Sequence, residues 1–126
     1  MSEMGGQWPS ELRLKDSGRT LSVSFENGPS FDLSAEYLRV MSPSAEVQGH
    51  SPEERVTVGG KEKCVIIGIE PVGTYAVRLT FDDMHSTGIY SWNFLYELGS
   101  QHEEKWAFYI AELAEKGLTR DRPGQL

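Results

Sequence analysis

The spacing of apolar residues changes along the chain, and this change restricts the folds that the chain can adopt. In residues 11–15 and 21–26, apolar and polar side chains alternate, which is the period of strands with one buried face. In residues 92–98 and 106–113, large apolar side chains recur every three or four positions, which is the period of helices with one buried face. Strands early in the chain and helices late in it predict an α+β fold.

Turn sequences divide the N-terminal part into three short strands. Residues 16–18 (Asp-Ser-Gly) and 27–29 (Asn-Gly-Pro) place glycine where a tight turn needs a positive φ angle. The three runs, of which the last ends in residues 30–33, are therefore expected to form a meander. Ser34 can cap a short helix after it, and Pro43 should end that helix by the preceding residue.

The middle of the chain is expected to be a long loop followed by a hairpin. Residues 40–60 contain several Gly and Pro but few large apolar side chains, and only 51–54 (Ser-Pro-Glu-Glu) have the pattern of a helical turn. Residues 64–69 form a nearly continuous apolar run, which predicts a central strand covered on both faces. After a turn at 71–73, the alternation over 75–81 predicts the returning strand.

Two helices are expected at the C-terminal end. Ser91 can cap a helix that runs through Leu98 and that Gly99 ends. Residues 100–103 (Ser-Gln-His-Glu) have the pattern of a capping box for a second helix that continues to Gly117. The expected architecture is a small, twisted, mostly antiparallel sheet with a short helix before a long loop and two C-terminal helices.

The length of 126 residues is that of one domain. Residues 1–9 and 118–126 are polar and contain Gly and Pro, so we expect a disordered leader and a disordered tail there. The single domain is expected over residues 10–117.

Charge and cysteine content exclude several classes of partner. The chain has 19 acidic and 12 basic residues and a net charge of -7, and its basic residues are not clustered, so we expect no nucleic-acid partner. A lone Cys64 cannot form an intramolecular disulfide, and no apolar run approaches the roughly 20 residues of a membrane span. We therefore expect a cytoplasmic protein that does not bind a membrane.

Two segments have a recognisable pattern when they are taken together. The first is LRVMSPSAEVQGH at residues 38–50, and the second is GTYAV at 73–77, which leads through FDD at 81–83 to HSTGIYSW at 85–92. In this order and separation they resemble the DUF971 family, also called the gamma-butyrobetaine hydroxylase-like N-terminal domain. The resemblance covers about residues 8–99, and it implies a domain that occurs alone in small bacterial proteins, at the N-terminus of gamma-butyrobetaine and trimethyllysine dioxygenases, and attached to some P-loop iron–sulfur scaffold proteins.

The resemblance also shows what this chain lacks. The dioxygenases carry a Leu-Arg-x-x-Cys-Pro-Cys-x-x-Cys segment and a later His that look like a structural zinc site. The matching positions here are Ser42, Ser44, Val47 and His85, of which one is a usable zinc ligand. We expect no metal and no cofactor, and no hydroxylase activity, since the 126 residues contain neither the dioxygenase catalytic domain nor the spacing of a 2-His-1-carboxylate iron site.

The matching segments supply the candidate binding or structural residues. These are Arg39, Ser42, Pro43, Ser44, Glu46, His50, His85 and Trp92. His85 has two interpretations: a structural staple that hydrogen-bonds the Ser42 to Ser44 loop in place of the metal, or a general base with Asp83 as its acid/base partner. In the family pattern a Gly usually precedes this His, whereas Met84 stands here, so the turn at this position is expected to differ.

Aromatic residues on the last predicted helix are the candidate partner surface. Trp106, Phe108 and Tyr109 cannot all face one core, so we expect some of them to contact a partner. The sequence thus favours a non-enzymatic binding or assembly module whose partner is another protein or a second copy of the chain. The resemblance links it to iron–sulfur or redox protein assembly. The alternative is a small enzyme that uses His85 and Asp83 on a substrate that the sequence does not identify.

Overall fold

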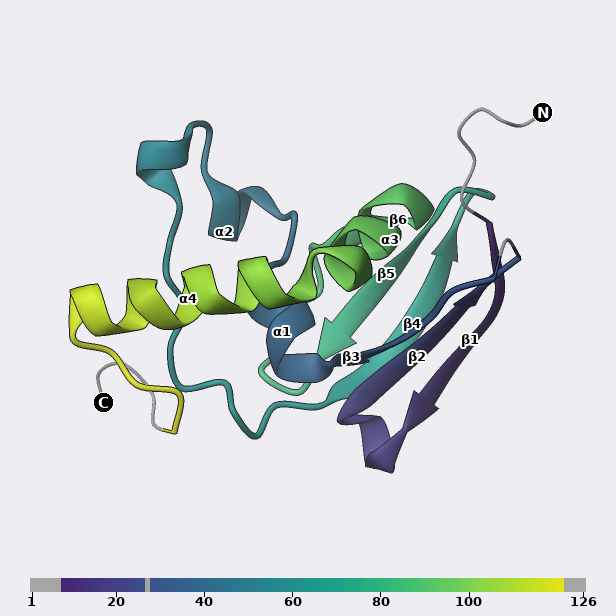
Figure 1. Cartoon of the computed structure of the whole chain (residues 1–126), viewed down its shortest axis with the longest axis horizontal. Coiled ribbons are helices and arrows are strands. Elements are labelled where there is room, and N and C mark those ends of the chain that lie inside the picture. The colour runs from purple at the N-terminus through teal and green to yellow at the C-terminus, as the bar shows by residue number, and fades with distance from the viewer. Residues whose placement is uncertain (1–7, 27, 122–126) are drawn as a thin grey trace.

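The computed structural model describes residues 8–26 and 28–121. Its elements, in chain order, are β1 (Pro9–Lys15), η1 (Asp16–Gly18), β2 (Thr20–Phe25), β3 (Ser30–Ser34), α1 (Ala35–Val40), α2 (Ala45–Gln48), η2 (Pro52–Glu54), β4 (Ile66–Val72), β5 (Ala76–Phe81), β6 (Ile89–Ser91), α3 (Trp92–Ser100) and α4 (His102–Lys116). Figure 1 shows the strands at one end of the molecule and α4 extending to the other. The fold is α+β, as the change of period predicts.

The strands form two antiparallel sheets where one was expected. One sheet has the order β1-β2-β3 and the other has the order β4-β5-β6. The meander was predicted correctly: β2 pairs with β1 and with β3, and Val23 lies opposite Leu12 and Phe31. The alternation identified each strand and its buried face, but it does not specify which strands become neighbours.

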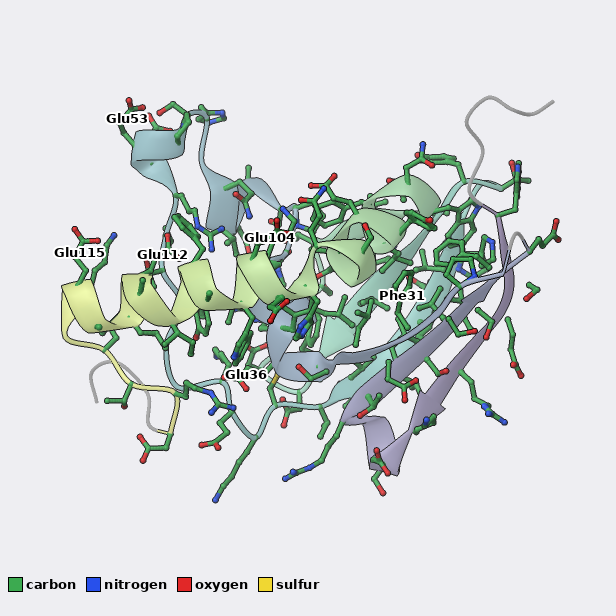
Figure 2. The ribbon with its side chains drawn as sticks, viewed as in Figure 1. Phe31, Glu36, Glu53, Glu104, Glu112 and Glu115 are labelled. Atoms are coloured by element: carbon green, nitrogen blue, oxygen red, sulfur yellow. The ribbon has the colours of Figure 1, made fainter. Side chains whose placement is uncertain are left out.

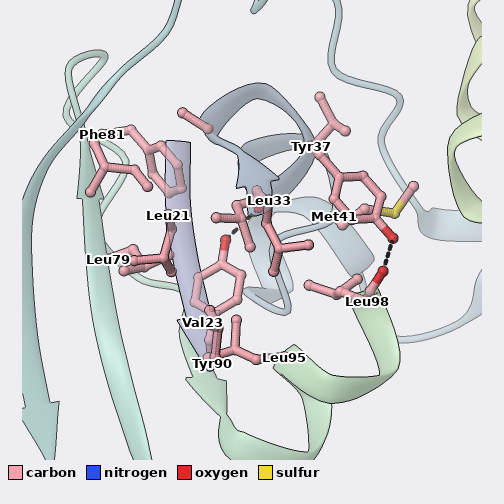
Figure 3. Packing of buried hydrophobic residues seen from close by; sticks show 14 of the residues in the cluster. Leu21, Val23, Leu33, Tyr37, Met41, Leu79, Phe81, Tyr90, Leu95 and Leu98 are labelled. Carbon is pink, nitrogen blue, oxygen red and sulfur yellow. Dashed lines mark hydrogen bonds between the residues drawn. The ribbon is translucent and has the colours of Figure 1, made fainter. Parts of the chain in front are cut away.

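A single cluster of buried side chains joins the two sheets to the helices (Figure 3). Leu21, Val23 and Leu33 from the first sheet and Leu79 from the second are all fully or almost fully buried. The buried Tyr37 hydroxyl donates to the backbone oxygen of Leu98 at 2.7 Å, so this tyrosine fills the core without leaving its polar atom unpaired. The core therefore holds α1 and α3 against the sheets.

The prediction of a central strand over residues 64–69 is wrong. β4 begins at Ile66, and among the described strands it pairs with β5 alone. Ile67 is 53 % exposed, so one face of the strand is not covered. An apolar run does not by itself distinguish a central strand from an edge strand next to a buried loop.

The helix boundaries correct two predictions about α3 and α4. Gly99 does not end α3, which continues through Ser100. The capping box is absent as well: Gln101 is the N-cap of α4 and makes no side-chain capping bond, while Ser100 Oγ donates to the Glu97 oxygen at 3.4 Å. The caps at Ser34 and Ser91 form as predicted, with Oγ accepting the amide of Tyr37 in one case and that of Phe94 in the other.

Both predicted ends of the domain need adjustment. β1 begins at Pro9, within the predicted leader, and residues 1–7 lie outside the described part. Of the predicted tail, residues 118–120 are ordered by contacts: Gly60 N–H donates to the Thr119 oxygen at 2.8 Å, and the Arg120 guanidinium binds Glu36 through two hydrogen bonds. Residues 122–126 are outside the description. In residues 8–26 and 28–121, no helix is long and apolar enough to cross a membrane.

Candidate functional site

Two segments that are far apart in the sequence meet beside α2. The first is the loop between α1 and α2, in which Ser44 caps α2 by accepting the Glu46 amide at 3.1 Å. The second is the connection between β5 and β6, which carries His85. Ser42 is completely buried and Ser44 is nearly so. The two serines therefore face the protein interior, where hydroxyl groups need hydrogen-bond partners.

The connection between β5 and β6 turns His85 inward. Met84 adopts a positive φ of 72°, which is uncommon for a residue with a side chain and is the conformation that Gly adopts freely. Phe81 N–H donates to the His85 oxygen at 3.0 Å and closes the turn. The tight turn is therefore kept although Met84 replaces the expected Gly. The His85 side chain is buried while that of Met84 points to solvent.

Both ring nitrogens of His85 contact the segment 42–46. Nε2 lies 2.9 Å from Ser42 Oγ, and Nδ1 lies 3.2 Å from Glu46 Oε1. The Glu46 carboxylate can only accept a hydrogen bond, so we assign the proton of the neutral ring to Nδ1, and Nε2 then accepts the Ser42 hydroxyl proton. Ser42 Oγ in turn accepts the Ser44 N–H at 3.2 Å. The structure thus places His85 against Ser42, as the staple interpretation requires, whereas the Ser44 hydroxyl contacts Thr87 Oγ1 at 2.6 Å.

Asp83 binds the main chain of its own turn and not the imidazole ring. Its Oδ1 accepts the His85 N–H at 3.1 Å, and its Oδ2 accepts Arg39 Nε at 2.8 Å and Lys61 Nζ at 2.6 Å. Partial burial raises the pKa of Asp83, but the hydrogen bonds from Lys61, the His85 amide and Arg39 outweigh it and lower the pKa to about 2. The His85–Asp83 acid/base pair of the alternative interpretation is not formed, because the carboxylate that faces the ring is Glu46.

Ser42, His85 and Glu46 lie in the order hydroxyl, imidazole and carboxylate, which is the order found in serine hydrolases. The surroundings do not suit a nucleophile, because Ser42 has no exposed surface. One groove is lined by Met41 and Pro43 and another by Ser86 and Thr87, but neither Ser42 nor His85 is part of their walls. Gly88 covers Ser42 closely, since a Cβ there would lie 2.6 Å from Ser42 Oγ. The Ser42 hydroxyl is therefore not placed to attack a substrate carbonyl.

The burial of His85 predicts a dependence of stability on pH. Burial lowers the pKa of His85 below its usual value of 6.5, and the nearby Arg39 lowers it further, although Glu46 and Asp83 act in the opposite direction. The unfolded chain then binds a proton at a higher pH than the folded protein does. The free energy of unfolding should therefore fall as the pH drops below 6.5. Denaturant titrations between about pH 7 and pH 5 measure this fall, which should be smaller for His85→Gln; equal falls in both proteins would contradict it.

The four positions that match zinc ligands lie together but do not fit a metal. The hydroxyls of Ser42 and Ser44 are used in hydrogen bonds, and Val47 contributes a buried alkyl side chain. Within residues 8–26 and 28–121, no three His, Cys, Asp or Glu side chains are grouped so that they could hold a metal ion. Zinc needs thiolate, imidazole or carboxylate donors, so hydrogen bonds and packing hold this part of the structure.

We expect the purified protein to contain no stoichiometric zinc or iron. Elemental analysis after purification without chelators tests this expectation. A variant with Ser42→Cys, Ser44→Cys and Val47→Cys restores the donor types beside His85 and is the positive control for zinc uptake. About one metal ion per wild-type chain, lost together with the fold on chelation, would overturn the expectation.

Cys64 lies just before β4 and is not part of the cluster around His85. The thiol is buried, and its burial, together with Asp82 and Asp83, raises its pKa to about 12. We expect slow alkylation of the native protein by iodoacetamide, because the thiolate is the reactive form. Cys64→Ser should lower the free energy of unfolding by roughly 1 to 2 kcal/mol, since the side chain belongs to the buried core cluster, where a hydroxyl is less favourable than a thiol. Alkylation of the native protein as fast as that of the protein unfolded in urea would show that the Cys64 thiol is accessible.

Two further predicted residues lie away from the cluster. His50 is exposed, and its backbone N–H donates to Glu54 Oε1 at 2.7 Å. Trp92 Nε1 donates to the Thr74 oxygen at 2.8 Å and fixes the start of α3 to the turn between β4 and β5. Lys61, which sequence analysis missed, does belong to the cluster through Asp83. Its distance along the chain and its position in a Gly-rich loop gave no signal for this contact.

The predicted aromatic partner surface is wrong for Tyr109. This side chain is completely buried, and its hydroxyl donates to the Val58 oxygen at 2.6 Å. Trp106 is partly buried, with the Arg120 guanidinium 5.3 Å from its ring centroid. Phe108 alone of the three has an exposed side chain, because the helical period rotates it by about 100° away from the buried Tyr109.

A groove lies beside Phe108, between the segment 41–55 and the helices α3 and α4. It has a volume of about 510 Å³, and its apolar walls are formed by Met41, Pro43, Phe94, Leu98 and Phe108. Sequence analysis missed this groove, because its two sides come from parts of the chain that have no common motif. The matching segment 38–50 contributes Met41, Pro43 and Gln48 to the groove, and of these Pro43 is one of the candidate residues named from the sequence.

Comparisons with known proteins agree with this fold. The model of the family "Gamma-butyrobetaine hydroxylase-like, N-terminal" matches residues 12–96. Two protein structures determined by solution NMR are similar: one with 46% identity and a TM-score of 0.77 over 91% of this chain and 90% of that chain, the other with 44% identity and a TM-score of 0.80 over 98% and 92%. No curated protein matches the chain.

A crystal structure of a DUF971 family protein of unknown function from Acidithiobacillus ferrooxidans is also similar. The identity is 36% and the TM-score is 0.60, over 72% of this chain and 91% of that chain. The similarity in sequence and in structure therefore points to the same family.

Proposed function

This chain belongs to the family of gamma-butyrobetaine hydroxylase-like N-terminal domains, and from that premise we propose that it is a non-enzymatic protein-binding or assembly module of the cytoplasm. One observation supports the proposal above the others: Ser42, Ser44 and His85 of the polar cluster are buried and hydrogen-bonded within the protein, and of the groups that contact the His85 ring the Glu46 carboxylate is the exposed one. Groups that catalyse reactions must reach a substrate, whereas this cluster holds the wall of an apolar groove in place.

The chemistry of the cluster supports a structural role for it. Ser42, Ser44 and His85 each have at least one hydrogen bond to another member or to a neighbour such as Thr87. Asp83 is neutralised by Arg39 and Lys61. A pre-formed, rigid wall lowers the entropy cost of binding, which is what a binding module needs. We further propose that the partner takes part in iron–sulfur or redox protein assembly, for which the support is the family resemblance alone.

Affinity capture tests the binding proposal. The chain is immobilised through its C-terminus and exposed to extract from cells in which it is expressed, with an equal amount of a heat-unfolded sample as the control. We expect at least one protein to be retained in near-stoichiometric amounts by the folded chain only. Retention of the same proteins by both samples, or of none by either, would overturn the proposal.

The order of Ser42, His85 and Glu46 favours one alternative, a serine hydrolase. A fluorophosphonate probe labels the activated serine of such enzymes. We expect no labelling of the wild type, since Ser42 is buried. Labelling that is lost in both Ser42→Ala and His85→Gln would establish the hydrolase alternative in place of the module.

A further inference from the structure

We infer that the groove between the segment 41–55 and the helices α3 and α4, called here the α4 groove, binds a cationic segment of a partner protein that carries large apolar side chains. This inference rests on the proposed binding function and specifies its surface and the chemistry of its partner. It is supported by the apolar walls of the α4 groove and by the distribution of charge around it.

The walls of the α4 groove can bury apolar side chains of a partner. Met41 and Leu98 are buried members of the core that also border the groove, and Phe94 packs against the same core. Phe108 stands at its edge with 57 % of its surface exposed. An exposed phenyl ring next to an apolar depression is typical of an interaction surface. Large aliphatic or aromatic side chains of a partner are therefore the groups that would gain most from this site.

The two cationic residues in the walls are already paired within the protein. Arg55 donates to Glu112 through Nε at 3.0 Å and through Nη2 at 3.1 Å. Lys105 Nζ lies 3.1 Å from Glu97 Oε2. Because these cations are neutralised, neither is available for an acidic partner without the loss of an existing ion pair.

The acidic residues around the α4 groove have fewer ion-pair partners than the two cations have. Glu104 lines the groove and is exposed, and among the described residues it has no ion-pair partner. Glu53 and Glu54 are exposed on η2, which directly precedes the wall residue Arg55. Figure 2 shows Glu53 and Glu104 on the side of α4 that also carries Glu112 and Glu115. The local field is therefore negative, and it favours Lys or Arg on the partner.

The same charge argues against a second copy of the chain as the occupant. The chain has a net charge of -7, and two copies that meet through this face would bring like charges together. Like-charge contacts are unfavourable at an interface. A partner segment with opposite charge satisfies both the apolar walls and the acidic edge.

Selection from a peptide library tests the inference with a defined probe. A phage-displayed library of random 16-residue peptides is selected on the full chain, and the enriched peptides are synthesised with a fluorescent label. We expect the enriched peptides to be net positive and to carry two or more large apolar residues. Their affinity should fall at least tenfold in Phe108→Ser, and about threefold in Glu104→Lys, because these changes remove an anchor contact and reverse a charge. Binding should also weaken as salt rises.

Two matched variants serve as controls. Ile110→Ser replaces another exposed apolar residue of α4 that is not part of the walls, and Glu11→Lys makes the same charge change at an exposed position of β1, away from the α4 groove. Both should bind the peptides as the wild type does. All four variants are expected to fold, because Phe108 and Glu104 are exposed and their replacement removes no core contact. Circular dichroism of each variant checks this expectation.

The outcomes separate this inference from the proposed function. Enriched peptides that bind Phe108→Ser as tightly as wild type would overturn the inference that the α4 groove is the binding site, but not the proposal that the protein is a binding module. The absence of enriched peptides, or the enrichment of acidic ones, would also overturn the inference, while affinity capture decides the module separately. Self-association that is abolished by Phe108→Ser in sedimentation experiments would identify a second copy as the occupant and overturn the cationic partner.

Discussion

Replacing His85 with alanine is expected to lower the free energy of unfolding by about 3 kcal/mol and to release the segment 41–49. The change removes the partner of the buried Ser42 hydroxyl, and an unpaired buried polar group costs roughly 1 to 3 kcal/mol. It also leaves a cavity where the ring packs near Phe81, which adds to the cost. Urea denaturation measures the change in stability.

Amide hydrogen exchange shows whether His85 is the link to this loop. In His85→Ala we expect faster exchange for the backbone amides of Ser44, Val47 and Gln48, which are bonded within the loop and α2 in the wild type. His50→Ala is the matched control, because its side chain is exposed and should change the stability by less than about 0.5 kcal/mol. Unchanged protection and unchanged stability in His85→Ala would refute the structural role and leave the hydrolase alternative as the better explanation of this residue.

Replacing Gly99 with alanine is expected to lower the free energy of unfolding by about 2 kcal/mol, although alanine is the better helix former. In an open helix the change from Gly to Ala stabilises by about 1 kcal/mol. In α3, however, a Cβ on Gly99 would overlap the ring of Phe31 on β3. This ring is held edge to face against Phe25 and Tyr96, so it has little room to move, and overpacking costs roughly 1 to 3 kcal/mol.

A second substitution tests this explanation of Gly99. If the clash with Phe31 is the cause, adding Phe31→Ala should make Gly99→Ala neutral or stabilising relative to Phe31→Ala alone. Gly68→Ala is the matched control on β4, because a Cβ there meets Thr80 only at an ordinary contact distance of 3.6 Å. A destabilisation by Gly99→Ala that persists without the Phe31 ring would show that the close packing of α3 on β3 is not the reason for this glycine.

Sequence analysis selected several residues of the candidate site but did not predict all of their contacts. Ser42, Ser44 and His85 were selected from their positions in the two matching segments, and the structure brings all three together. The partner of the His85 ring was not predictable in the same way. Asp83 is closer to His85 in sequence than Glu46 is, yet Glu46 faces the ring because α2 carries it there.

The fold shows the same division between local and non-local information. The meander, the helix capped by Ser34 and the helix capped by Ser91 were predicted correctly, because each depends on residues within one short segment. Residues 118–120 were predicted to be disordered, whereas Arg120 binds Glu36. Local sequence analysis could not find this bond, because the two residues are far apart in the chain. The prediction of a central strand at 64–69 was wrong for a similar reason, because the position of a strand within a sheet depends on its pairing with other segments.

The sequence by itself therefore determined the α+β class and the order and faces of most elements. These features follow from residue type and local periodicity, which the linear chain displays directly. That Ser42, Ser44 and Val47 stand where relatives carry cysteines followed from the resemblance of the two matching segments to the family. Only the tertiary structure decided that the strands form two sheets, that Gly99 makes room for Phe31, and that a groove opens beside Phe108. Each of these depends on which distant segments pack together, and a local pattern is compatible with more than one such packing.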